Sequence, residues 1–202
     1  MATNYTKPER FGIKEVADVA FYALDAKGQP TGEPVIVFDT LKVSNIEYTA
    51  EQAEARGGKG NAPLIIWDYG REITVTLEDA LLSMETLGLM FENSKTAGSD
   101  GTIEISANTY PATYYVEGKT FARNENDGND HLLTFKIYKA KIQSEVTLTM
   151  EADGDPTVFG MNLRVLRADG GKMMSLERDT DEFSGEIKWD DKTPVDPDPE
   201  TT

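Results

Sequence analysis

The chain has 202 residues and no cysteine, is 39% hydrophobic and 28% charged, and carries a formal net charge of −16. This composition predicts a folded chain with an apolar core, and the missing cysteines exclude disulfides, thiolate metal sites and a cysteine nucleophile. Proteins that bind nucleic-acid phosphates or anionic lipids carry an excess of basic residues, whereas this chain is strongly acidic. We therefore expect it to bind neither nucleic acids nor anionic membranes tightly.

No segment resembles an export signal or a membrane span. The first residues, MATNYTKPERFG, contain no apolar stretch typical of a secretory signal. No run approaches the ~18 apolar residues of a spanning helix. We therefore expect no membrane association, and the missing cysteines are compatible with assembly in a reducing cytoplasm.

Strand patterns dominate the first part of the chain. Val16–Leu24 is apolar at both parities, which predicts a strand buried on both faces. Asp25–Pro34 has the composition of a turn. One long strand is then expected over Val35–Tyr48, with a change of parity near Ser44-Asn45 that is typical of a β-bulge or a strong bend.

The glycine-rich stretch that follows, residues 50–63, is expected to be a long exposed loop. Beyond it, Leu64–Trp67 and Arg71–Leu77 predict two further strands.

The hydrophobic period then changes to that of a helix. We place this helix at about Leu77–Leu87, because its apolar residues recur at helical spacing. Thr76 and Asp79 fit a capping box at its start, and Gly88 fits a C-terminal stop.

The second half returns to strand patterns, in the segments Thr102–Ser106, Thr113–Arg123, His131–Ile142, Glu145–Glu151 and Thr157–Arg167. Asp169–Lys172 is expected to form a hairpin turn into a further strand. The fold class is therefore mainly β, an antiparallel sandwich or barrel with one flanking helix. We expect one domain over residues 1–189, including the long loop 50–63, and a Pro/Asp-rich tail over residues 190–202.

The motif Gly57-Gly58-Lys59-Gly60 raises the question of a phosphate site. A phosphate-binding loop needs Ser or Thr after the lysine and a helix directly behind it. Here Gly60 follows Lys59, and a strand pattern comes next. We therefore predict no nucleotide site and no cofactor.

Metal and catalytic sites are also disfavoured. Asn124–Asp130 looks like a calcium loop, but its EF-hand alignment puts Arg123 at position 1 and Thr134 at position 12, where acidic ligands belong. Glu151–Pro156 is best interpreted as an acidic turn. His131 is the only histidine, so no multi-histidine metal site can form. We predict no metal ligand and no catalytic residue.

Four aromatic residues have two interpretations. They could form a stacking platform for a sugar or a base, or they could be core and subunit-contact residues, which is the commoner role in strands. These residues are Trp67, Tyr69, Tyr114 and Tyr115.

Three segments resemble a bacteriophage major tail tube protein: RGGKGN (Arg56–Asn61), WDYGREI (Trp67–Ile73) and TLEDALLS (Thr76–Ser83). The resemblance is strongest over Phe11–Phe91. It implies a β-sandwich with one helix, six copies of which form a ring. Rings would stack into a tube around a tape measure protein, and DNA would later pass through. It also implies a tail terminator and distal tail or baseplate proteins as partners, a place in the virion tail, and assembly in the host cytoplasm.

Contractile injection systems and tailocins use the same tube fold, so the resemblance leaves the type of tail open. Under this interpretation the glycine-rich loop is an assembly contact, whose cations pair with acidic groups of a neighbour. The predicted subunit or inter-ring contacts are Arg56, Gly57, Gly58, Lys59, Gly60, Asn61, Trp67, Tyr69 and Arg71. An acidic lumen would suit DNA in transit, because a wall that attracts phosphates would stall it.

Two other classes of protein fit less well. A capsid decoration or adhesin-like β-sandwich that binds a protein or a glycan would share this composition, but it would stay monomeric or trimeric and would not need the glycine-rich loop. An enzyme would need convergent polar groups in one pocket, and the sequence marks none.

Overall fold

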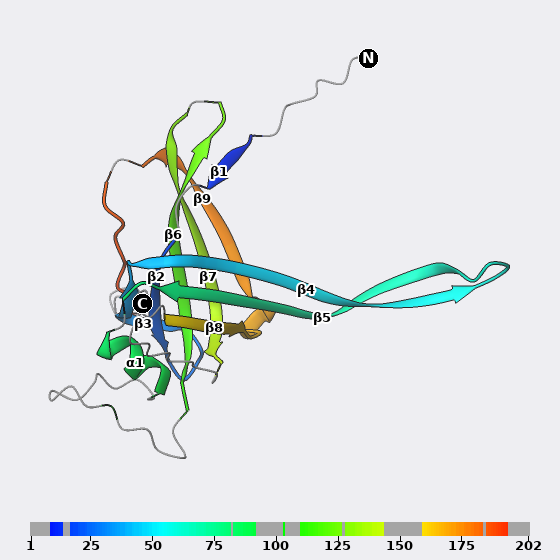
Figure 1. Ribbon diagram of the computed structural model, residues 1–202, viewed down its shortest axis with the longest axis horizontal. Coiled ribbons are helices and arrows are strands. Elements are labelled where there is room, and N and C mark those ends of the chain that lie inside the picture. Colours follow the sequence, from blue (N-terminus) through cyan, green and yellow to red (C-terminus); the bar gives the residue numbers. More distant parts are fainter. Residues whose placement is uncertain are drawn as a thin grey trace, which may run out of the picture.

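The computed structural model describes residues 9–13, 17–81, 83–91, 103, 110–126, 128–143, 159–183 and 185–193. In this part of the chain, nine strands form one antiparallel sheet and a single α-helix packs beside it (Figure 1). The elements are β1 (Phe11–Ile13), β2 (Asp18–Leu24), β3 (Pro30–Phe38), β4 (Leu41–Gly57), β5 (Ala62–Asp79), α1 (Met84–Phe91), β6 (Thr113–Asn124), β7 (Asp130–Ile142), β8 (Phe159–Val165), the 3-10 turn Asp169–Gly171 and β9 (Met174–Glu182). Apart from Ile103, the segments Thr102–Ser106, Glu145–Glu151 and Glu151–Pro156 lie outside the described residues.

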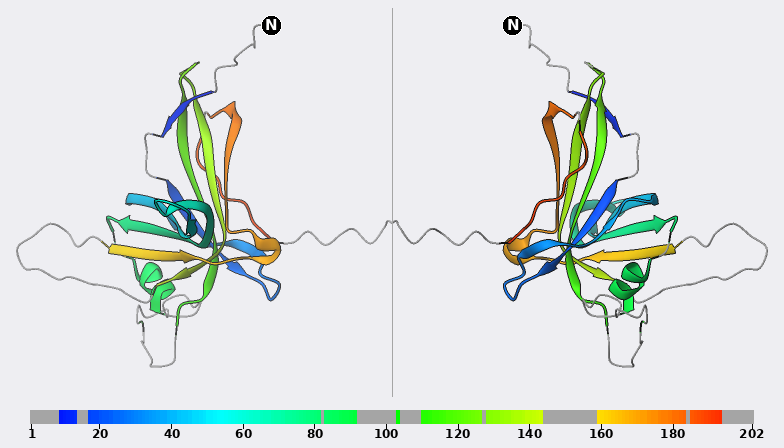
Figure 2. Two further views of the ribbon diagram at one scale, coloured as in Figure 1. Left: turned by 90° about the vertical axis from the view of Figure 1, so that its right-hand side faces the viewer. Right: turned by 90° about the vertical axis from the view of Figure 1, so that its left-hand side faces the viewer.

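The hairpin of β6 and β7 lies at the centre of the sheet. The strand order is β3-β2-β6-β7-β8-β5-β4, with β1 added to β6 and β9 added to β7. β8 and β5 run across the lower part of the β6–β7 hairpin, so the sheet folds over on itself (Figure 2). The order ends at β3 and β4, which leaves the sheet open rather than closed into a barrel. The predicted mainly β, antiparallel fold with one helix is confirmed.

The folded sheet and α1 enclose one apolar core. Phe21 of β2 meets the rings of Phe38 and Tyr114 edge to face, at centroid distances of 5.4 and 5.9 Å. Such pairs contribute about 0.5–1.5 kcal/mol beyond the area that they bury. The alternation predicted for β8 is confirmed, because four of its side chains are at most 4% exposed: Phe159, Met161, Leu163 and Val165.

Strand β2 is buried on both faces, as its apolar pattern predicted. Val19 and Phe21 belong to the main core, whereas Ala20 and Tyr22 belong to a second cluster. The second cluster is covered by the chain's own segment 185–193, through Trp189. A neighbouring subunit is therefore not needed to cover this face.

A buried ion-pair cluster anchors that C-terminal segment. Glu117, 2% exposed, lies 3.2 Å from Lys119 Nζ and 3.1 Å from Lys192 Nζ. Lys119 Nζ also donates to the carbonyl oxygen of Lys188 at 2.6 Å and lies 4.8 Å from the centre of the Trp189 ring. Removing one partner of a buried pair leaves the other charge uncompensated, at a cost of about 3–5 kcal/mol. The cluster therefore holds residues 188–192 against the sheet.

The strand predicted over Val35–Tyr48 is two strands. β3 ends at Phe38 and pairs with β2, whereas β4 begins at Leu41 and pairs with β5 at the other edge of the sheet. Thr40 between them donates its hydroxyl to the Asp79 carboxylate, which fixes the change of direction. The bulge predicted at Ser44-Asn45 is wrong, since the first register shift of β4 lies between Leu41 and Val43.

The predicted helix exists, but its position Leu77–Leu87 is wrong. Leu77 is 2% exposed in strand β5, where it pairs with both β4 and β8, so tertiary pairing overrides the local helical spacing. The N-cap of α1 is Ser83, whose Oγ accepts a hydrogen bond from the Thr86 backbone N–H at 3.0 Å. Asp79 does not cap the helix, because its carboxylate accepts a hydrogen bond from the Thr40 hydroxyl. Gly88 lies buried within the helix instead of ending it.

Two turn predictions also need correction. Pro30 to Pro34 belong to β3, so the turn expected over Asp25–Pro34 is confined to its first half. Asp169–Lys172 does not close a hairpin, because β8 pairs with β5 and β7 whereas β9 pairs only with β7. β8 and β9 instead follow one another along the same side of β7.

Gly118 offers a direct test of core packing. A Cβ at this position would lie 2.0 Å from the Phe135 ring, so Gly118→Ala forces the ring or the backbone to move. We expect a loss of about 3 kcal/mol or more in the free energy of unfolding, measured by urea titration. Gly160→Ala in β8 is the matched control, because nothing lies within 4 Å of its Cβ. Equal effects of the two substitutions would contradict the packing described.

The second aromatic cluster predicts sensitivity to alkali. Burial, followed by the charge of Glu117, raises the pKa of Tyr22 and Tyr115 above the ordinary value of 10.0. Unfolded tyrosines therefore ionise first, and the free energy of unfolding should fall as the pH rises above about 10. Tyr22→Phe should weaken this fall.

The same variant should be at least as stable as the parent at about pH 8, because the buried Tyr22 hydroxyl has no hydrogen-bond partner in the described part of the chain. Urea midpoints at several pH values measure both effects. A steeper alkaline loss in Tyr22→Phe than in the parent would contradict the assignment.

Candidate functional site

Strands β4 and β5 extend far beyond the rest of the sheet. They pair from Leu41 opposite Asp79 to Gly57 opposite Ala62, whereas β8 pairs with β5 only from Thr74 onward. Residues 49–72, which we call the arm, therefore form a two-stranded ribbon that projects from the molecule (Figure 1). No residue of the arm is buried.

The expectation of a long loop over residues 50–63 is therefore wrong. The ladder of β4 and β5 continues through this stretch, and only residues 58–61 form a turn. The two strands predicted at Leu64–Trp67 and Arg71–Leu77 are likewise one strand, β5. The glycines suggested a loop, but they allow left-handed backbone only at the tip and at Gly70. Gly70 has a φ of 61° and lies beside a register shift of the ladder.

The glycine-rich motif makes the tip of the arm. Gly58, Gly60 and Asn61 have φ values of 78°, 99° and 51°, and the Asn61 backbone N–H donates to the Gly58 carbonyl oxygen at 3.2 Å. Glycine and asparagine tolerate this left-handed conformation best. The motif therefore closes a tight hairpin turn.

Two cations lie at this tip. Arg56 Nε donates to Glu54 Oε2 at 2.7 Å, an exposed pair of the kind that contributes about 0–1 kcal/mol. Lys59, within the turn, forms no ion pair with the residues that the structure describes. The tip thus presents positive charge on a strongly acidic chain.

One face of the arm is apolar. Residues directly opposite each other in a ladder share a face, and Ala53 and Ala55 lie opposite Trp67 and Ile65. Tyr69 follows on the same face by alternation. The three large side chains of this face are each between 52% and 53% exposed: Ile65, Trp67 and Tyr69. The sequence does not single out Ile65 as a contact residue, because Leu64–Trp67 is apolar at both parities and does not reveal which residues share a face.

The opposite face of the arm is more polar. Gln52 lies opposite Asp68 and donates its side-chain N–H to the carboxylate at 2.9 Å. Glu54 lies opposite Ile66. Leu64 and Ile66 are also exposed on this second face. The arm is therefore an amphipathic ribbon, and no residue of it is buried by another described part of the chain. A lone two-stranded hairpin is at best marginally stable in water. Contiguous exposed apolar side chains are a common feature of interaction surfaces.

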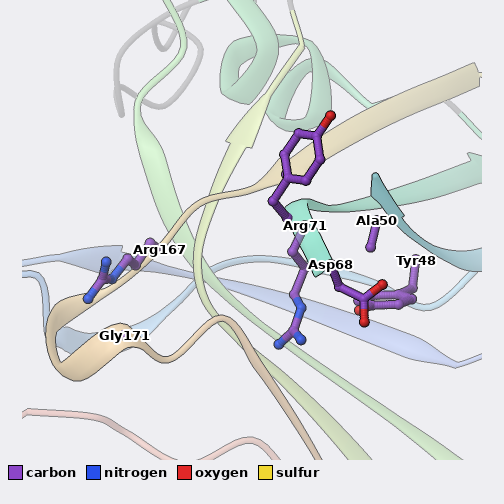
Figure 3. A pocket seen from close by; sticks show the side chains of 8 residues that line it. Tyr48, Ala50, Asp68, Arg71, Arg167 and Gly171 are labelled. Atoms are coloured by element: carbon purple, nitrogen blue, oxygen red, sulfur yellow. The ribbon is translucent and has the colours of Figure 1, made fainter. Parts of the chain in front are cut away.

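A cavity of about 380 Å³ lies at the base of the arm (Figure 3). Arg71 and Arg167 line it together with Tyr48, Asp68 and Gly171. The Arg71 guanidinium lies 5.5 Å from the centre of the Tyr48 ring, a cation–π contact. This basic, aromatic hollow joins the arm to the segment after β8.

The structure thus divides the predicted contact residues into two groups. Arg56 to Asn61 lie at the tip, whereas Trp67, Tyr69 and Arg71 lie along the shaft toward the base. The four aromatic residues do not form a common stacking platform. Tyr114 and Tyr115 are buried in β6, and β7 and β8 separate that strand from β5, which carries Trp67 and Tyr69.

Among the described residues, no three side chains of the metal-binding types gather where they could hold an ion. The same part of the chain contains no helix long and apolar enough to cross a membrane.

The sequence matches the family described as the YomU/Tube protein family over residues 11–94 and 93–176. This chain belongs to the YomU/Tube protein family. It is a structural protein of tail tubes rather than an enzyme, in agreement with the resemblance to major tail tube proteins.

Among solved structures, the chain is similar to one in the PVC sheath-tube complex, in its extended state, of an extracellular contractile injection system. The two share 12% sequence identity with a TM-score of 0.43, over 80% of this chain and 88% of that chain. A search of curated proteins found no match.

The arm and the body should respond differently to loss of a tryptophan. Trp67 is half-exposed on the arm, whereas Trp189 covers the second aromatic cluster. We expect Trp67→Ser to change the free energy of unfolding of the unassembled monomer by no more than about 0.5 kcal/mol. Trp189→Ser should cost about 2 kcal/mol or more. Circular dichroism during urea unfolding measures both, and a large loss in the Trp67 variant would show that the arm packs on its own body.

Proposed function

We propose that this tube protein forms hexameric rings, and that the rings stack into a tail tube whose acidic lumen lets DNA pass. The observation that carries the proposal is the apolar face of the arm, which the chain leaves uncovered although it covers both faces of β2. Six-fold rings follow from the resemblance to bacteriophage major tail tube proteins. The arm provides the contact between subunits.

Physical chemistry supports self-association through the arm. Burying apolar surface contributes about 25 cal/mol per Å², and the arm offers three large apolar side chains on one face. Identical copies that join through two different surfaces form closed rings or open filaments. A tube made of stacked rings combines both outcomes.

The charge of the chain constrains how copies meet. At a net charge of −16 per copy, subunits repel one another unless basic groups lie at the contacts. Arg56 and Lys59 at the tip and Arg71 at the base are placed to offset this repulsion. Acidic groups left on the inner wall would repel the phosphates of passing DNA, so that it slides without adhering.

The remaining assignments follow from the same resemblance. Separately, the composition favours one domain over residues 1–189 and a Pro/Asp-rich tail over residues 190–202, and the start of that tail is held to the domain by the pair of Lys192 and Glu117. The tube assembles in the host cytoplasm around a tape measure protein, is closed by a tail terminator, and joins distal tail or baseplate proteins in the virion tail. Contractile and non-contractile tails both fit this arrangement.

Charge reversal at the tip tests the proposal. Arg56→Glu combined with Lys59→Glu should give a folded chain that no longer polymerises, because the tip would then repel an acidic neighbour. Negative-stain microscopy measures the result. Lys27→Glu combined with Lys141→Glu is the control, since it makes the same change in net charge at exposed positions outside the arm.

The control should still form tubes. Long tubes from the tip variant would contradict the role of the arm. Monomers or trimers of the unchanged protein would instead favour the capsid decoration or adhesin class.

A further inference from the structure

The β4–β5 hairpin has a second end, opposite to its basic tip. There a hollow of about 490 Å³ opens between the β3–β4 turn, the end of β5 and the start of α1. Val37, Asp39, Leu81 and Glu85 are among the residues that line it, and we call these four the acceptor hollow.

The acceptor hollow combines apolar surface with free negative charge. Val37 and Leu81 are 37% and 66% exposed. Asp39 and Glu85 are exposed carboxylates that form no ion pair with the described residues. Glu85 also lies in the first turn of α1, where it offsets the positive end of the helix dipole. Asp79 is different, because it is buried and accepts hydrogen bonds from Thr40 and from the Leu81 backbone N–H.

The tip of the arm has the complementary composition. Lys59 and Arg56 supply positive charge, and Leu64 beside the turn is 68% exposed. We propose that the acceptor hollow receives the arm tip of a second copy of this chain, with Lys59 between Asp39 and Glu85 and with Leu64 against Val37 and Leu81. This inference rests on the proposed function and names the surface on which the arm docks.

The geometry requires that the occupant come from another copy. The hairpin runs from the pair Leu41–Asp79 beside the hollow to the pair Gly57–Ala62 at the tip. At about 3.3 Å per residue, this ladder separates the two ends by roughly 50 Å. A chain's own tip therefore cannot reach its own hollow (Figure 1).

A donor at one end of a hairpin and an acceptor at the other define a head-to-tail contact. Such a contact uses two different surfaces, so every added copy leaves one tip and one hollow free. It therefore propagates into rings or filaments instead of ending at a dimer. Charge complementarity at both ends also fixes the polarity with which copies add.

The absence of cysteine from the natural sequence allows a direct test by cross-linking. Lys59→Cys combined with Glu85→Cys should form disulfides between copies under mild oxidation, since the proposal sets these two positions against each other and a disulfide joins Cα atoms up to about 7 Å apart. A denaturing gel should show a ladder of dimers, trimers and larger species. Lys27→Cys combined with Glu85→Cys should give no ladder. Equal cross-linking by both pairs, or none by the first pair in assembled protein, would overturn the proposal.

A charge exchange tests the same contact without oxidation. Lys59→Glu, and Asp39→Lys combined with Glu85→Lys, should each lower the sedimentable fraction by about tenfold or more. Combining all three substitutions should restore it. Glu33→Lys combined with Glu186→Lys is the control for added positive charge. Circular dichroism checks that each variant is folded.

The outcomes separate this inference from the proposed function. If the unchanged protein forms tubes and Lys59→Glu prevents them, but reversal of Asp39 and Glu85 does not, the arm is an assembly contact and the acceptor hollow is not its docking surface. If the unchanged protein forms no assembly, both proposals fail together.

Discussion

The structure depends on one ladder that is longer than the sheet it belongs to. β4 and β5 pair along their whole length, but β8 accompanies them only from Thr74. Within the core, alternate residues of β5 such as Ile73 and Val75 are buried. Beyond it, the same strand carries large apolar side chains that stay at least half-exposed in the described part of the chain. A two-stranded ribbon of this kind gains little stability from its own contacts, which is why we propose that another molecule covers its exposed face. The membership in a tube family gives that requirement a function.

In the body of the protein, in contrast, the chain itself covers most of the apolar surface of the sheet. The C-terminal segment covers the second face of β2, β6 and β7, and the paired charges of Glu117, Lys119 and Lys192 fix it there. At the two ends of the β4–β5 hairpin, exposed apolar surface lies beside charges that form no ion pair with the described residues. Assembly contacts at those ends would leave the body unchanged, so a subunit can fold first and join a tube afterwards.

Local sequence predicted the parts of the fold that local periodicity controls. The alternation in β8 and the two-sided apolar pattern of β2 were correct because each reports directly on burial. The helix was predicted too early in the chain because Leu77 and Leu81 have helical spacing. Leu77 instead lies in β5, where it pairs with β4 and β8. Glycines at positions 57, 58 and 60 suggested a loop, since sequence cannot distinguish a flexible loop from the turn of a long hairpin. The tip cations could be predicted, whereas the apolar face required the register that places Ala53 opposite Trp67.

A cryo-EM reconstruction of the assembled protein would locate the arm tip relative to other subunits, and would therefore show whether the arm is an assembly contact. We expect Gly58 to Asn61 to contact a different subunit, and Ile65, Trp67 and Tyr69 to lose most of their exposure. An assembly in which the arm projects into solvent or into an open lumen, with these three side chains still exposed, would contradict it.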